Sequence, residues 1–126
     1  MAPFIRKYEA ETYASMRIIV GVLFMCHGAA KLFGFPQDPP EAPAFIIYIA
    51  GSIEFFGGLL VAIGLFTSWA AFLSSGLMAA AYWIAHGTGG LFPILNGGEL
   101  AVLYCFVFLY IAAHGPGKWS IDQARA

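Results

Sequence analysis

Long apolar segments, separated by short stretches rich in proline and glycine, limit most strongly what this chain can fold into. The first two cover residues 16–34 and 44–66, and the loop between them contains four prolines, which cannot continue a helix. Two further apolar segments cover residues 69–86 and 97–114, with a tight connection at Thr67 and Ser68 before the third. These segments are apolar on nearly all sides, whereas helices of a soluble bundle each carry a polar face. The pattern predicts an all-α integral membrane protein.

The composition and length agree with this interpretation. The chain is 60% hydrophobic and 10% charged, whereas soluble domains contain about 25% charged residues. A membrane span needs about 20 apolar residues, so 126 residues accommodate four spans with short connections. We therefore expect residues 1–126 to form a single domain, an antiparallel up-down four-helix transmembrane bundle. The net charge of −1 and the lack of a basic cluster argue against binding to nucleic acid.

The distribution of basic residues predicts an orientation. In membrane proteins, Lys and Arg are enriched in cytoplasmic segments. Lys31 is the one basic residue expected near the far ends of the helices. The other five lie on the side that holds both termini: Arg6, Lys7, Arg17, Lys118 and Arg125. We expect a multi-pass protein of the plasma membrane with both termini in the cytoplasm.

Ionisable residues inside or at the edges of the apolar segments are candidates for a functional site. A charged side chain at the bilayer centre costs about 3 kcal/mol or more, so such residues face one another or a polar cavity. Glu54 is the deepest of them and requires a partner or a proton. Arg17 lies near the cytoplasmic end of its segment, where its long side chain can reach the head groups. The expected polar site comprises His27, Lys31, Glu54, His86, Asn96 and Glu99.

Depth in the membrane suggests how these residues pair. With a rise of 1.5 Å per residue, Lys31 lies about 5 Å, His27 about 10 Å and Glu54 about 15 Å below the outer ends of their spans. We therefore expect ion pairs of Lys31 with Glu99 and of His27 with Glu54. Several of these polar residues also have an alternative, purely structural explanation. Asn96 and Glu99 have the spacing of a helix capping box, and Lys31 and His86 have positions typical of interfacial polar residues.

Helical spacing also predicts which residues share a face of each segment. Small residues on such a face let helices approach closely in lipid, and this is the simplest reason for the glycines. The predicted faces are Arg17, Gly21, Phe24, Gly28 and Lys31 on the first segment; Ala50, Glu54, Gly58 and Ala62 on the second; Ala71, Ser75 and Ala79 on the third; and Glu99, Leu103, Phe106 and Tyr110 on the fourth.

Common cofactor and metal motifs are not found in the sequence. Phosphate-binding loops, a Ser-centred nucleophile turn and a set of zinc cysteines are all missing. His27 and His86 would differ in depth by about 10 Å, which argues against two haem ligands at one level. Glu54, Glu99 and the two histidines are suitable ligand types for a metal, but they lack the Glu-x-x-His spacing of di-metal bundles. We expect no metal site.

Four stretches of the chain resemble the DoxX family of small four-span membrane proteins. They are R-x3-G-x2-F-x2-HG-x2-KLFG from Arg17 to Gly34, E-x2-GG-LL-x3-G-x2-T from Glu54 to Thr67, P-x2-NGGE-x-A-x-LY from Pro93 to Tyr104, and GPGKWSID from Gly115 to Asp122. The resemblance implies a four-helix integral membrane protein. Some members of that family are membrane subunits of a thiosulfate:quinone oxidoreductase, and others belong to membrane complexes with sulfur-transfer and oxidative-stress enzymes.

This resemblance leads to a functional hypothesis. The chain would be a membrane subunit or accessory of a redox system that works near the quinone pool, with a quinone or a small sulfur oxyanion bound by the polar site. Lys31 would bind an anion or a ring carbonyl, and His27 with Glu54 would relay protons. Tyr82 and Trp83 could stack on a ring, although aromatic residues at this depth commonly form the interfacial belt.

No residue of the chain carries electrons unaided, so any oxidoreductase activity would need a partner subunit or a cofactor. The alternative hypothesis is a non-enzymatic small-solute carrier or a membrane scaffold, in which the buried ions fix how the helices pack. Four spans are few for a carrier, and the chain shows neither an inverted repeat nor a broken helix; a homo-oligomer could compensate for the small size.

Overall fold

The computed structural model describes residues 2–87 and 89–126, and these residues form helices and connecting loops with no β-strand among them. Four helices are long: α1 (Glu9–Phe33), α2 (Ala44–Ile63), α3 (Thr67–Ala81) and α5 (Glu99–His114). The shorter elements are a 3-10 turn η1 (Arg6–Tyr8), a π-helical turn η2 (Tyr82–His86) that continues α3, and the helices α4 (Pro93–Asn96) and α6 (Ile121–Arg125).

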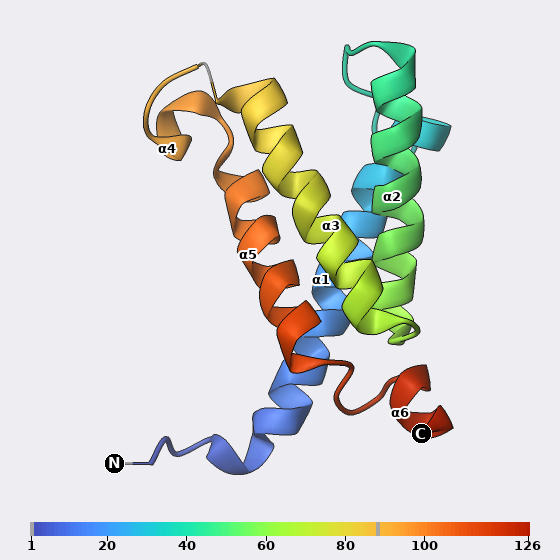
Figure 1. Ribbon diagram of the computed structural model, residues 1–126, viewed down its shortest axis with the longest axis vertical. Helices are drawn as coiled ribbons and strands as arrows, with labels where there is room; N and C mark the ends of the chain where they lie inside the picture. Colours follow the sequence, from blue (N-terminus) through green and yellow to red (C-terminus); the bar gives the residue numbers. More distant parts are fainter. Residues whose placement is uncertain (1, 88) are drawn as a thin grey trace.

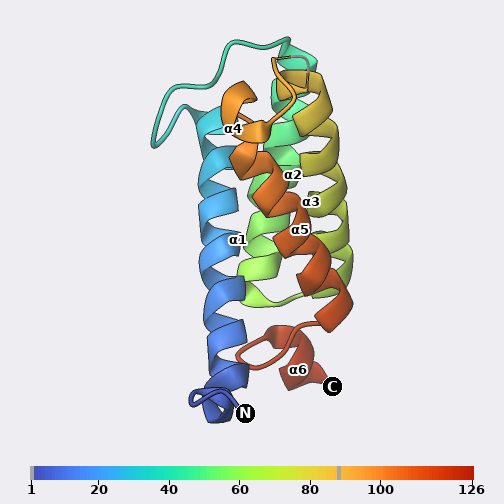
Figure 2. The ribbon, with the colours of Figure 1, turned by 90° about the vertical axis from the view of Figure 1, so that its left-hand side faces the viewer.

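The four long helices lie side by side along the long axis of the molecule (Figures 1 and 2). Helix α1 packs most extensively on α2, and α3 packs on α5 and, less extensively, on α2. Both chain termini and α6 lie at one end of the molecule, which we call the terminal end. The loop of residues 34–43 and helix α4 lie at the opposite end, which we call the loop end.

The helix boundaries follow from local chemistry. Helix α1 begins at Glu9, seven residues before the predicted segment. The acidic residues in its first turn interact favourably with the positive end of the helix dipole. It ends where Gly34 adopts a left-handed conformation with φ of 67°. Helix α2 begins at Ala44 as predicted but ends at Ile63, because Gly64 turns the chain with φ of 72°. The connection to α3 is therefore residues 64–66, and not Thr67 and Ser68, which already belong to α3.

In the part of the chain that the structure describes, three helical segments are long and apolar enough to cross a membrane: Arg6–Phe33, Ala44–Ile63 and Thr67–His86. The third combines α3 with η2, so that it ends at the predicted residue. Helix α5 is also apolar, but with 16 residues it is shorter than these three. It begins at Glu99, two residues after the predicted start of its segment.

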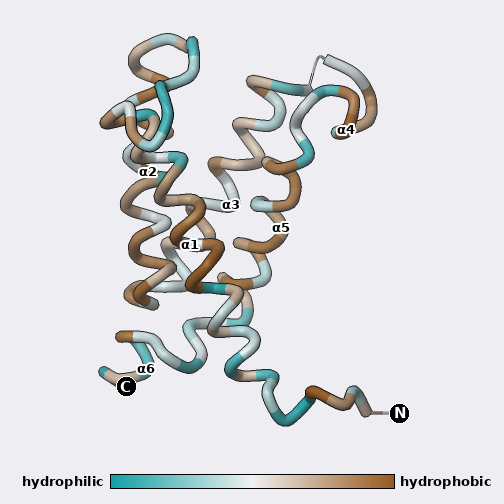
Figure 3. Tube along the Cα trace, turned by 180° about the vertical axis from the view of Figure 1, so that it is seen from behind, coloured by the Kyte–Doolittle hydropathy of each residue, from teal (hydrophilic) through white to brown (hydrophobic). Residues whose placement is uncertain are grey.

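The exposed surface of the helices is far more apolar than that of a soluble protein. Large apolar side chains are exposed along the helices, for example Phe56, Phe72 and Phe106 with exposed fractions of 57%, 59% and 64%. Arg17 and Glu54, in contrast, are buried, with exposed fractions of 0% and 3%. Hydrophobic residues follow the helices, whereas hydrophilic ones gather at the loops and ends (Figure 3). A soluble protein rarely exposes so much apolar surface, whereas lipid contact accounts for it.

A narrow seam of glycines joins α1 to α2. A Cβ atom added to Gly28 would lie 2.2 Å from the Phe55 backbone nitrogen, and one added to Gly58 would lie 2.6 Å from the Gly21 carbonyl oxygen. Backbone atoms cannot move aside as side chains can, so only glycine allows the two helices this close contact. The predicted face of the first segment is confirmed: Arg17, Gly21, Phe24 and Gly28 are buried and Lys31 is partly buried.

The core between the four helices is small and aromatic. Its α5 residues are Tyr104, Phe108 and Ile111, and the tilted rings of Phe24 and Phe108 have centroids 4.6 Å apart. The face that we predicted for this segment, Glu99 with Leu103, Phe106 and Tyr110, is instead the exposed one. Both faces have helical spacing and are rich in apolar residues, so the sequence pattern alone does not distinguish the buried face from the lipid-facing one.

Candidate functional site

A buried ion pair joins α1 to α2 in the half of the molecule nearer the loop end. Lys31 Nζ donates hydrogen bonds to both carboxylate oxygens of Glu54, at 2.6 and 2.9 Å. The Glu54 side chain is 4% exposed and the Lys31 side chain 20%. The carboxylate is therefore enclosed by protein, while the ammonium group remains partly open to the surroundings. The prediction that Glu54 lies inside the protein with a polar partner is confirmed.

The glycine seam sets the geometry of this pair. Lys31 lies in the last turn of α1, and its Cβ would be 2.9 Å from a Cβ atom added to Gly51. Because the backbones approach so closely there, the long Lys31 side chain runs along α2 to reach Glu54, one turn further along that helix.

The pairing of Lys31 with Glu99 that we expected from depth was wrong. Depth gives the level of a residue along the axis, but it does not give the neighbouring helix. Lys31 faces α2, whereas Glu99 is exposed at the start of α5. The expected pair of His27 with Glu54 does not form among the described residues either, because Glu54 is already bound by Lys31.

His27 remains close to this region as an exposed side chain. It lies one turn before Lys31 on α1, and its imidazole ring meets the Tyr104 ring edge-on, with centroids 5.9 Å apart.

Asn96 organises the loop end. Its amide nitrogen donates to the Tyr82 hydroxyl at 2.9 Å and to the Gly90 carbonyl at 3.2 Å. Its carbonyl oxygen in the side chain accepts from the Gly98 backbone nitrogen at 2.8 Å. The His86 Nδ1 atom lies 3.1 Å from the Asn96 backbone oxygen. Asn96 therefore ties the end of the third helical segment to the loop before α5.

The capping box predicted from Asn96 and Glu99 is absent from the described residues. The residue before α5 is Gly98, and no side chain caps that helix. Because Gly97 is left-handed with φ of 76°, the chain turns after Asn96 and the Asn96 amide bonds to the Gly98 nitrogen instead. Glu99 still lies in the first turn of α5, where a carboxylate interacts favourably with the positive end of the helix dipole.

Arg17 lies towards the terminal end and is fully buried, which overturns the prediction that it extends to the head groups. Its Nε donates to the Val61 carbonyl at 3.0 Å, close to the negative end of α2. Its guanidinium group also binds the loop that follows α5. The further acceptors are the carbonyl oxygens of Ala62, Pro116, Lys118 and Trp119. The long arginine side chain thus fastens α1, α2 and the C-terminal segment together.

Asp122 caps α3 from the C-terminal segment, a role that sequence reasoning missed. Its carboxylate accepts from the backbone nitrogens of Phe66 and Thr67 at 3.0 and 2.9 Å, and from the Thr67 hydroxyl at 2.8 Å. Partial burial acts to raise the pKa of the Asp122 carboxyl, but the Thr67 and Phe66 hydrogen bonds, with the nearby charge of Arg125, hold it below its usual range. No sequence pattern indicated this contact, because Thr67 and Ser68 are themselves suitable capping residues and Asp122 lies 55 residues after Thr67.

The ion pair offers a hydrogen-bond donor to a ligand. Of the three N–H groups of Lys31, two bind Glu54, so one remains for an external acceptor. No group of three or more His, Cys, Asp or Glu residues that could hold a metal ion is found in the part of the chain described.

Comparison with known proteins identifies related chains. The family model DoxX matches residues 13–87. An uncharacterized protein of Haemophilus influenzae is 42% identical over 126 residues, with 94% of each chain covered. The inner membrane protein YqjF of Escherichia coli is 29% identical over 125 residues, with 94% of this chain and 95% of YqjF covered. No solved structure matches this chain significantly.

Proposed function

Since this chain belongs to the DoxX family and is a membrane protein, we propose that it crosses the bacterial inner membrane four times as an antiparallel bundle of α1, α2, α3 with η2, and α5. The position of both termini at one end supports an even number of crossings. Helix α5, with 16 residues, is about 24 Å long, less than the roughly 30 Å of the hydrocarbon core. The preceding residues 93–98 complete this crossing.

We further propose that the protein is a membrane subunit or accessory of a quinone-linked redox system. The observation that carries this proposal is the Lys31–Glu54 pair, a charged pair held among apolar helices with one member partly open. The free N–H group of Lys31 suits a ring carbonyl of a quinone or an oxygen of a small sulfur oxyanion. When bound, a quinone supplies the two-electron chemistry that the side chains lack.

The residues of this chain would bind the quinone or the oxyanion. Lys31 would hold its acceptor oxygen, and Glu54 would hold the Lys31 ammonium group in position. Electron transfer would depend on a partner enzyme. The site would lie in the half of the membrane opposite to the termini, because Lys31 lies in the last turn of α1.

A scaffold function is the competing candidate, and one observation favours it. Lys31 already donates to both carboxylate oxygens of Glu54, and the glycine seam next to them fixes the packing of α1 on α2. A pair of this kind can set the relative position of two helices without binding any ligand.

Measurement of bound quinone distinguishes the two functions. The protein is extracted from bacterial membranes into lipid nanodiscs, and the quinone content per protein is determined by mass spectrometry. The test variant is Lys31→Met with Glu54→Gln, which removes both charges together and so leaves no buried charge unpaired. The matched control is Lys118→Met with Glu11→Gln, which removes the exposed ion pair of 2.9 Å at the terminal end.

For the redox function we expect quinone in the native protein and in the control variant, with a loss of tenfold or more in the test variant. Circular dichroism checks that all three proteins are folded. Quinone at the level of empty nanodiscs in the native protein would contradict the redox proposal and favour the scaffold function.

A further inference from the structure

Two adjoining cavities lie at the terminal end, between the start of α1 and the end of α5. Their volumes are about 320 and 370 Å³, and neither includes any residue of the Lys31–Glu54 region. Both are bordered by Arg6, Glu9, Tyr13 and His114, which form a common wall. A ligand that occupied both cavities would extend across this wall.

The two cavities differ in chemistry. The first, which we call the polar cavity, adds Lys7 and Lys118 to the wall residues, so that three basic side chains face one carboxylate. The second, the apolar cavity, adds Pro3, Ile5 and Tyr110, with Thr12 as its additional polar residue. A basic pocket beside an apolar one suits a molecule that is anionic at one end and hydrophobic at the other.

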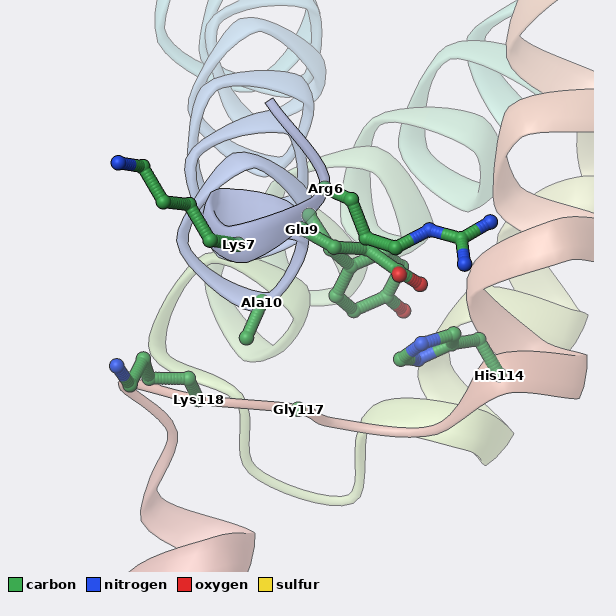
Figure 4. A pocket seen from close by; sticks show the side chains of 8 residues that line it. Arg6, Lys7, Glu9, Ala10, His114, Gly117 and Lys118 are labelled. Carbon is green, nitrogen blue, oxygen red and sulfur yellow. The ribbon is translucent and has the colours of Figure 1, made fainter. Parts of the chain in front are cut away.

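Two of the three basic side chains of the polar cavity form no ion pair within the described part of the chain. Lys118 is bound to Glu11 at 2.9 Å, but among the described residues Arg6 and Lys7 form no ion pair. Arg6 and His114 lie on one side of the polar cavity and Lys7 and Lys118 on the other (Figure 4). Basic side chains therefore border the polar cavity on both sides, with the Glu9 side chain between them.

The wall between the cavities is held in place by the fold. The Tyr13 ring stacks on His114 with centroids 3.8 Å apart, and the Tyr13 hydroxyl donates to the Gly115 carbonyl at 2.7 Å. These contacts join α1 to the end of α5 and fix the Tyr13 and His114 rings between the two cavities. This arrangement keeps the ordering cost of binding low.

We propose that an anionic phospholipid binds here, with its phosphate in the polar cavity and the first part of an acyl chain in the apolar cavity. The location supports this, because the cavities lie where the apolar helices end and where tyrosines commonly mark the membrane interface. Basic side chains near a membrane surface attract anionic lipids. The proposal goes beyond the redox function, because it concerns the other end of the molecule.

Native mass spectrometry of the detergent-purified protein tests this proposal. Phosphatidylglycerol and phosphatidylcholine with identical acyl chains are added at equal concentration, and the fraction of lipid-bound protein is measured. We expect the native protein to retain more phosphatidylglycerol. The variant R6Q/K7Q should lose on the order of tenfold in affinity for this lipid. The control is Arg125→Gln, which removes one basic residue at the same end that does not border either cavity, and its effect is compared with half the loss of binding free energy in R6Q/K7Q.

A second variant tests the apolar cavity. Ile5→Ser should weaken binding of phosphatidylglycerol severalfold, because Ile5 borders only the apolar cavity. Free glycerol 3-phosphate should compete poorly at the same concentration. Equal retention of the two lipids, a loss of binding free energy in Arg125→Gln of at least half that in R6Q/K7Q, or effective competition by free glycerol 3-phosphate would each overturn the proposal of a lipid site.

Discussion

Lys31 on α1 and Glu54 on α2 form a two-point ion pair, with the ammonium nitrogen 2.6 and 2.9 Å from the two carboxylate oxygens. Arg17, 14 residues before Lys31 on the same helix, donates hydrogen bonds to carbonyl groups in the last turn of α2. The glycine seam lies between these two polar contacts. Helix α1 is thus fastened to α2 by charge at two levels and by close backbone contact between them.

Replacement of Glu54 by leucine should leave Lys31 without its partner inside the protein. We expect a loss of roughly 2–3 kcal/mol in the free energy of unfolding, at the lower end for a broken buried pair because Lys31 is partly exposed. Adding Lys31→Met should recover most of this loss, since no charge is then unpaired. Denaturant titration in detergent, followed by circular dichroism, measures both values. Simple additivity of the two changes would show that the pair contributes no coupling.

The glycine seam should not tolerate even one methyl group. Gly28→Ala would place Cβ 2.2 Å from the Phe55 backbone nitrogen, so α1 and α2 would have to separate, at a cost of about 3 kcal/mol or more. Gly76→Ala is the matched control, because a Cβ atom there has no neighbour within 4 Å. The control should be neutral or slightly stabilising, as alanine favours a helix. Thermal unfolding of the two variants compares them directly, and equal stability would refute the close approach.

Arg17 should hold the C-terminal segment in place. In Arg17→Met the carbonyl groups of Pro116, Lys118 and Trp119 lose their common donor. We expect amide hydrogen exchange in residues 117–122 to rise at least tenfold while the exchange of α3 rises less. Arg17→Lys should recover only part of the protection, because one ammonium group cannot reach acceptors spread over two segments. Unchanged exchange in Arg17→Met would contradict this role.

The stability that the Asp122 cap contributes should depend on pH only under acidic conditions. Because the pKa of Asp122 is lower in the folded chain, its contribution is complete above the unfolded pKa of about 3.9 and is lost as the pH falls through the folded value. At neutral pH, Asp122→Ala should cost about 1 kcal/mol or less. Stability of the Asp122→Asn variant should vary less with pH below 4 than that of the native protein. Parallel acid unfolding curves of the two would argue against the cap.

The proposed orientation places both termini in the cytoplasm. Five of the six basic residues lie in the segments on the terminal side, and basic segments remain in the cytoplasm. A C-terminal green fluorescent protein should therefore fluoresce, and alkaline phosphatase inserted in the loop of residues 34–43 should be active. The opposite pair of signals would reverse the orientation and move the proposed lipid site to the outer leaflet.

The sequence by itself determined the apolar helices and the buried face of α1. These properties are local: proline and glycine end helices, and a repeat of small residues every three to four positions defines one face. The importance of Glu54 could also be predicted, because a carboxylate within an apolar segment needs a partner wherever the helix packs. The identity of that partner could not be predicted.

Only the tertiary structure decided which groups meet. Lys31 reaches Glu54 and not Glu99 because the glycine seam brings α2, and not α5, against this face of α1. Arg17 is buried because the loop after α5 folds back and its backbone carbonyls accept hydrogen bonds from the guanidinium group. Every residue has a backbone carbonyl, so no sequence pattern identifies these acceptors. Asp122 caps a helix that begins 55 residues earlier in the chain. Spacing along a helix determines the direction in which a side chain points and its depth in the membrane, whereas contacts between distant segments depend on how those segments pack.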